Sequence, residues 1–81
     1  MDKVVVNLNT IEKVKSFVNT ITKFPCDMDL VASSNRYIID AKSIMGIFSL
    51  DLSKDLNLII HSEDPLVREG VKDALREFIV K

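Results

Sequence analysis

The stretch Lys42–Leu50, with the sequence KSIMGIFSL, decides how this chain is interpreted. If it forms a helix of 3.6 residues per turn, Met45 lies on one side. Three other apolar side chains fall together on a different side: Ile44, Ile47 and Phe48. The core of a small domain is thin, and only one of these sides can readily face it. The pattern therefore predicts a short helix with a partly exposed apolar patch, the usual mark of a protein-binding site, unless the helix is sunk deeply enough to bury both sides.

A pair of strands is predicted immediately before this helix. Asp27–Ala32 alternates polar and apolar residues, which is typical of a half-exposed strand, and Arg36–Asp40 returns as a second strand. The residues between them, Ser33-Ser34-Asn35, favour a turn. The pair therefore reads as a hairpin, and the helix that follows is predicted to span Ala41–Leu52.

The first part of the chain predicts a strand and a helix. Lys3–Asn7 contains three consecutive β-branched valines, as in a strand buried between neighbours. Asn9 can cap the helix that follows, and Glu12 can reach back to complete a capping box. Pro25 ends that helix, because the residue before a proline is pushed out of the α region. The predicted apolar stripe of the helix comprises Ile11, Val14, Phe17, Val18 and Ile21.

The last part of the chain predicts another strand and helix. Asn57–Ser62 alternates two faces, with His61 pointing outward. Asp64 caps the final helix and Pro65 takes its first position. The apolar face of this helix, which runs to about Ile79, comprises Val67, Val71, Ala74, Leu75 and Phe78. The order β-α-β-β-α-β-α indicates an α+β fold, with helices packed on one face of an antiparallel or mixed sheet.

Composition narrows the class of protein. The 81 residues suffice for one domain, 1–81, and 47% of them are hydrophobic, as in a folded protein. The net charge of −1 and pI near 5.7 argue against direct nucleic-acid binding, which usually needs a basic stripe. A lone cysteine, Cys26, fits a reducing cytoplasm and reads as a small buried residue. No segment is apolar enough to span a membrane. No residue pattern indicates a metal, a cofactor or a phosphate-binding loop, and the carboxylates of Asp27 and Asp29 on one strand face read as solvated.

Ser43 lies where the short helix begins, and its position allows two interpretations. Its hydroxyl can cap the helix by accepting a hydrogen bond from a backbone N–H. It can also be a phosphorylation site, because a phosphate there would meet free N–H groups and would change the charge beside the apolar patch. Spacing and composition do not choose between these two roles.

Asp40–Leu50 closely resembles the regulatory segment of HPr, the small phosphocarrier of the bacterial phosphoenolpyruvate-dependent sugar phosphotransferase system. The run Lys-Ser-Ile-Met-Gly, with Ser-Leu soon after, carries the resemblance, and the element order is also that of the HPr family. The resemblance implies an open-faced β-sandwich, with a four-stranded antiparallel sheet and three helices on one face. It implies that a dedicated kinase phosphorylates Ser43, and that Ile44, Met45 and Phe48 contact partner enzymes and regulators.

The family's phosphate-carrying histidine has no counterpart here. In HPr proteins this histidine begins the first helix and is closely followed by an arginine and a proline. Alignment through Asp27–Leu30 places Thr10 near the histidine position and Glu12 near the arginine. The carboxylate of Glu12 would repel a phosphoryl dianion and compete for the N–H donors of the helix start. The sole histidine, His61, lies on the last predicted strand, so we expect no relay of phosphate through histidine and no catalytic residue.

Three functions remain open at this stage. The first is a cytoplasmic, non-enzymatic interaction module that binds partner proteins through the Ser43 helix and the residues Ile44, Met45, Ile47 and Phe48. Its partners would be phosphotransferase-system enzymes, a serine kinase or a transcription regulator. The second is an active phosphocarrier that uses an unexpected residue. The third is a domain that retains the fold without any link to sugar transport.

Overall fold

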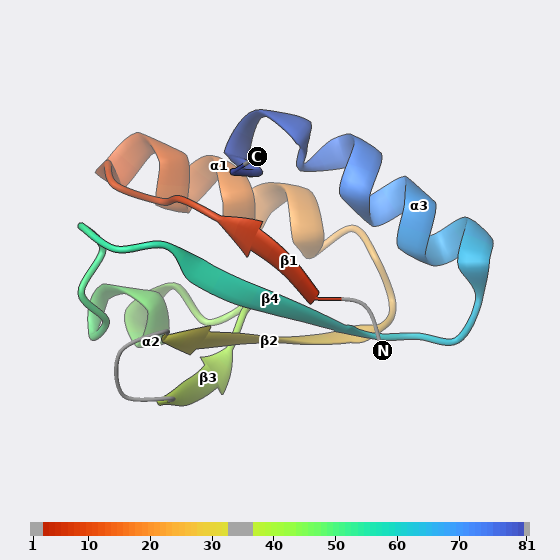
Figure 1. Ribbon diagram of the computed structural model, residues 1–81, viewed down its shortest axis with the longest axis horizontal. Helices are drawn as coiled ribbons and strands as arrows, with labels where there is room; N and C mark the ends of the chain where they lie inside the picture. The colour runs from red at the N-terminus through yellow and green to blue at the C-terminus, as the bar shows by residue number, and fades with distance from the viewer. Residues whose placement is uncertain (1–2, 33–36, 81) are drawn as a thin grey trace.

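The computed structural model describes residues 3–32 and 37–80, and Figure 1 shows their arrangement. The predicted turn Ser33-Ser34-Asn35 lies outside the described residues, and so does Arg36, the first residue of the second strand predicted for the hairpin. In chain order the elements are β1 (Lys3–Val6), α1 (Ile11–Ile21), β2 (Asp27–Ala32), β3 (Ile38–Asp40), α2 (Ile44–Phe48), β4 (Leu56–His61), α3 (Pro65–Ala74) and a 3₁₀ turn, η1 (Arg76–Phe78).

The four strands form one antiparallel sheet in the order β1-β4-β2-β3. Helices α1 and α3 lie over one face of this sheet, and α2 lies near the end where β2 finishes (Figure 1). Helix α2 packs against both α1 and β3. The expected α+β fold, with a four-stranded antiparallel sheet and three helices, is confirmed.

The core lies between the sheet and the helices. Alternate residues of β2 and β4 face it, so the period of two in those strands becomes a layer of buried side chains. On α1 and η1, Phe17 and Phe78 meet edge to face, with ring centroids 5.8 Å apart. The buried strand residues of this layer are Val4, Val6, Met28, Leu30, Ala32, Leu56, Leu58 and Ile60.

The start of α1 differs from the prediction. Thr10, and not Asn9, is the cap, because Thr10 has the extended backbone and its hydroxyl accepts from the Lys13 N–H. Glu12 therefore stands one position too early to complete a capping box. Ile11, expected on the apolar stripe, is 59% exposed at the first helical position. The helix also ends at Ile21, before Pro25 can terminate it.

β1 is an edge strand and is not placed between two neighbours. Its outer side is partly covered by the end of the chain, where Val6 forms a bridge with Ile79. The Asn7 N–H donates to the Phe78 carbonyl at 2.9 Å, and the Val80 N–H donates to the Val5 carbonyl at 2.8 Å. These bonds satisfy backbone groups that an edge strand would otherwise present to solvent.

Two helices are shorter than predicted. α2 covers only Ile44–Phe48, because the residues before Ser43 form a turn in which Asp40 accepts from the Lys42 N–H. α3 ends at Ala74, and the chain tightens into η1 so that it can pair with β1. Ala74 is consequently exposed, although the sequence placed it on the apolar face.

Candidate functional site

Ser43 caps α2 as expected. Its backbone is extended, with φ −96° and ψ 106°, and its Oγ accepts a hydrogen bond from the Gly46 N–H at 3.1 Å. The side chain is exposed to solvent. A side chain on Gly46 would place a Cβ only 3.1 Å from this same Oγ, so the glycine leaves room for the capping hydroxyl. Ser43 therefore combines a structural role with an accessible hydroxyl.

Helix α2 does expose apolar side chains, but they are not the same residues as predicted. Met45 is 76% exposed and Phe48 is 41% exposed, while Ile44 is partly buried. Ile47 is completely buried, so its assignment to the exposed patch and to partner contact is wrong. Residues two apart on a helix point about 200° from each other, so the burial of Ile47 directs Met45 outward. We call Ile44, Met45 and Phe48 the docking face.

A further exposed apolar residue, Ile11, begins α1. Helices α1 and α2 pack against each other, and the start of α1 lies toward the same end of the molecule as α2 (Figure 1). The sequence reading missed Ile11 as a surface residue because its spacing matched the apolar stripe. The signal that could have corrected this is its position directly after Thr10, at the very end of the helix.

Lys42, directly before Ser43, holds the start of α2 against another part of the chain. Its Nζ donates a hydrogen bond to the Phe24 carbonyl at 2.7 Å in a partly buried position. Phe24 lies beyond the end of α1, and its own N–H donates to the Ile21 carbonyl at 3.0 Å. Nothing in the local sequence signals this contact, because the two residues are 18 positions apart.

The start of α1 carries the hydroxyl of Thr10, which caps the helix. The Oγ of Thr10 accepts from the Lys13 N–H at 3.1 Å, and the Thr10 carbonyl accepts from the Val14 N–H at 3.1 Å. Glu12 lies exposed in the first turn of the helix. This helix start therefore presents a capped N–H and a negative charge, a poor setting for a phosphoryl group.

His61 lies far from that helix start. Val6, at the end of β1 that leads to α1, pairs with Leu56, whereas His61 is the last residue of β4. The five residue steps between Leu56 and His61 span about 17 Å at about 3.4 Å per residue. His61 also stands on the open face of the sheet, where its Nε2 lies 2.8 Å from Oδ2 of Asp29. It is an outward-facing strand residue, as expected, and it lies away from the start of α1.

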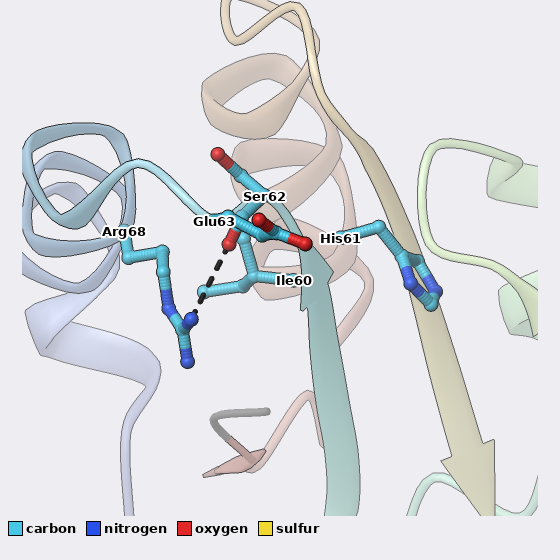
Figure 2. Close-up of a pocket in the computed structure, with 5 residues that line it drawn as sticks. All are labelled: Ile60, His61, Ser62, Glu63 and Arg68. Carbon is cyan, nitrogen blue, oxygen red and sulfur yellow. Dashed lines mark hydrogen bonds between the residues drawn. The ribbon is translucent and has the colours of Figure 1, made fainter.

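A surface hollow of about 390 Å³ opens where β4 runs into α3. Figure 2 shows that the side chains of Arg68 and His61 point to opposite sides of β4 there. The Arg68 guanidinium donates to the Ser62 carbonyl at 3.3 Å, so it holds the chain at this bend. These groups do not converge on one point, and the hollow offers no pair placed for acid–base chemistry.

Other features of the described residues limit the chemistry further. Within residues 3–32 and 37–80, no group of three or more His, Cys, Asp and Glu side chains is placed to hold a metal ion. In the same ranges, every helix is too short or too polar to cross a membrane.

Asp51, shortly after α2, accepts two hydrogen bonds from Ser53: the Ser53 hydroxyl donates at 2.6 Å and the Ser53 N–H donates at 3.1 Å. These two hydrogen bonds hold the pKa of Asp51 below its ordinary value.

Comparison with known proteins agrees with the fold. The family model described as the HPr component phosphorylation site of the phosphotransferase system matches residues 12–80, a range that begins beyond Thr10. The crystal structure of HPr-C-His from Thermoanaerobacter tengcongensis is similar over 95% of this chain and 89% of that one, with a TM-score of 0.72 and 26% identity. No match was found among curated proteins.

Proposed function

The chain belongs to the HPr family of the phosphotransferase system, and on that premise we propose that it acts as a regulatory interaction module. In this proposal residues 1–81 form a single cytoplasmic HPr-like domain that binds proteins through the Ser43 helix. It is neither an enzyme nor a carrier that relays phosphate through histidine. The observation that carries the proposal is the exposure of Met45 and Phe48 beside an exposed Ser43.

The docking face has the features of a binding surface. Met45 and Phe48 are a flexible thioether chain and an aromatic ring, two side-chain types that are enriched at protein interfaces. Neither is needed to fill the core, because Ile47 takes the inward position of α2. Partners of suitable chemistry are phosphotransferase-system enzymes, a serine kinase or a transcription regulator, each presenting an apolar pocket.

Ser43 is the proposed regulatory position. Its hydroxyl is exposed and stands two residues before Met45 in the chain. Phosphorylation there would add between about −1.5 and −2 charges at neutral pH. A partner that covers the docking face with apolar groups would then have to desolvate the phosphate or make room for it. Phosphorylation of Ser43 is therefore expected to change the choice of partner.

The start of α1 supports the absence of a relay. The resemblance places Thr10 near the position of the family's histidine, and a phosphate ester of threonine lacks the transfer potential of a phosphohistidine. Glu12 adds a carboxylate to the first turn of α1. His61 stands at the other end of β4 and on the open face of the sheet.

The relay is tested by incubating the protein with phosphoenolpyruvate and the first enzyme of the phosphotransferase system. We expect no acid-labile phosphoryl group on the chain, while an HPr with its histidine, assayed in parallel, acquires one. Transfer to this chain would instead establish the alternative function, an active phosphocarrier.

The docking face is tested by binding to the same first enzyme, measured by calorimetry. Met45→Ala is expected to weaken binding about tenfold, in line with the loss of one interface contact. Leu66→Ala is the matched control, because Leu66 is 83% exposed and is the second residue of α3, which starts at the opposite side of the view from α2 (Figure 1). Equal weakening by both substitutions would place the contact elsewhere.

The switch is tested with the HPr serine kinase and ATP. We expect one phosphate per chain, located at Ser43 by mass spectrometry, and none on Ser43→Asn, which keeps a capping side chain. An unmodified wild-type chain would remove the regulatory part of the proposal and leave the docking face alone.

A further inference from the structure

We propose that Lys42 is a positioning residue that couples charge at Ser43 to the loop between α1 and β2, residues 22–26. The inference rests on the proposed function in one respect only, since it takes phosphorylation of Ser43 as the natural source of that charge. The loop 22–26 is separate from both the docking face and the start of α1.

The first step is the unusual partner of Lys42. Its ammonium donates to the Phe24 carbonyl at 2.7 Å, where the contact is partly buried. Across the described residues, 3–32 and 37–80, no carboxylate pairs with this ammonium within 4.0 Å. The positive charge is thus satisfied by a neutral oxygen, although a hydrogen bond to an anionic acceptor is about twice as strong.

The second step is the place of Ser43 in the chain. It directly follows Lys42, and its exposed Oγ bears no fixed charge. The four-carbon stem of a lysine is flexible enough to redirect its ammonium toward a new acceptor. A negative charge placed on residue 43 therefore competes with the Phe24 carbonyl for the ammonium of Lys42.

The third step concerns the other contacts that hold Phe24 in place. The ring of Phe24 is partly buried against the core, and it lies beside α3, since a Cβ built on Gly70 would be 3.6 Å from its Cε1. The Phe24 N–H is bound to the end of α1. When Lys42 leaves, the loop keeps these two contacts but loses its hydrogen bond to the residue that precedes the cap of α2. The loop should then open more often, without unfolding of the domain.

Cys26 makes this opening measurable. It is the only cysteine in the chain, it lies at the end of the loop, and it packs in a partly buried position against the core. The rate at which its thiol reacts with Ellman's reagent reports how often the loop opens. No label, partner or kinase has to be introduced.

The experiment compares Ser43→Asp with Ser43→Asn in the full chain. Both side chains cap a helix well and they are nearly the same size, so they differ essentially in charge. We expect Ser43→Asp to react roughly fivefold faster than Ser43→Asn, the scale set by losing one hydrogen bond to a charged group. Urea unfolding should show the same global stability for the two, so that the difference is local.

The Lys42→Met variant tests whether Lys42 carries the effect of charge at position 43. Alone, it should raise the thiol rate by about the same factor, and Lys42→Arg, which keeps a donor, should raise it less. In Lys42→Met, aspartate and asparagine at position 43 should give equal rates, because the coupling residue is gone. Equal rates in the wild-type background, or an unchanged aspartate effect without Lys42, would overturn the proposal. Because the assay needs neither kinase nor partner, these outcomes are independent of whether the proposed function holds.

Discussion

The starts of α1 and α2 are built in the same way but are equipped differently. Each is capped by a hydroxyl residue whose Oγ accepts from the N–H three residues later at 3.1 Å: Thr10 from Lys13, and Ser43 from Gly46. The first turn of α1 carries the acidic residue Glu12, whereas the first turn of α2 carries none. Helix α1 buries three residues beneath it, whereas α2 buries only Ile47.

This difference shows that two helix starts can be capped in the same way and still differ in the groups that they can bind. A capping hydroxyl satisfies the same backbone donor in both places, so the fold is served equally well. A phosphoryl group at a helix start also needs the absence of a repelling charge, and the first turn of α1 carries the carboxylate of Glu12. The proposed regulatory role falls to α2, where the capping hydroxyl is accompanied by an exposed docking face.

The largest effect is expected when the start of α1 is changed so that it can accept a phosphoryl group. We expect Thr10→His together with Glu12→Arg to accept phosphate from the first phosphotransferase enzyme at least about tenfold faster than Thr10→His alone, because the charge beside the dianion is reversed. Radiolabelled phosphoenolpyruvate measures both rates. Thr10→His with Glu12→Gln isolates the removal of the carboxylate. Equal rates for all three variants would show that Glu12 is not an obstacle.

Removing the two capping hydroxyls tests their equivalence. Thr10→Ala and Ser43→Ala should each lower the free energy of unfolding by about 1 kcal/mol, since each leaves an N–H without its acceptor. Urea denaturation followed by circular dichroism gives both values. Thr10→Asn and Ser43→Asn are the controls that keep a cap. A loss at only one of the two sites would show that the caps are not equivalent.

Gly46 distinguishes the two helix starts in finer detail. In the wild-type background Gly46→Ala brings a methyl to within 3.1 Å of Ser43 Oγ and 3.4 Å of Ile39 Cδ1, so the gain in helix propensity should be largely cancelled. In Ser43→Ala the hydroxyl is absent, and the same substitution should be more favourable by about 0.5 to 1 kcal/mol. Denaturation of the four proteins in this cycle gives the coupling. Additive effects would mean that Gly46 does not make room for the cap.

The smallest expected effect concerns Asp51, a carboxylate beyond the far end of α2. Ser53→Ala should raise its pKa toward the ordinary value, because the hydroxyl hydrogen bond is the largest cause of the lowered pKa. A carboxyl with a lowered folded-state pKa contributes stability above its unfolded pKa, and this is lost as pH falls through the folded value. Asp51 is fully exposed, so the contribution is small. A side-chain NMR titration measures the pKa, and an unshifted value in Ser53→Ala would contradict the assignment.

Periodicity predicted the parts of the fold in which neighbours along the chain decide the outcome. The alternation in β2 and β4 identified the faces of the sheet, and Asp64 with Pro65 at the start of α3 was confirmed in both position and role. Ser43 was confirmed as a cap for the same reason. At α1 the choice between Asn9 and Thr10 depended on backbone angles, because either residue type can cap a helix.

The remaining features depend on contacts between distant residues. Ile47 was expected at the surface because it was grouped with Ile44 and Phe48 on one side of the helix. Which side of this five-residue helix is buried is set by how it meets α1 and β3. The hydrogen bond from Lys42 to Phe24 and the bridge between Val6 and Ile79 join segments far apart in sequence. Such contacts leave no local pattern, so only the structure shows them.

The shortness of α2 has a consequence for how this surface can evolve. With Ile47 as its one fully inward residue, the helix tolerates changes of composition at Met45 and Phe48 without loss of core. A change of length is different, because inserting or deleting one residue before Ile47 turns every later side chain by about 100° and exchanges inward for outward positions. The composition of this exposed surface can therefore drift through substitutions alone, while the length of the segment stays fixed by a single buried isoleucine.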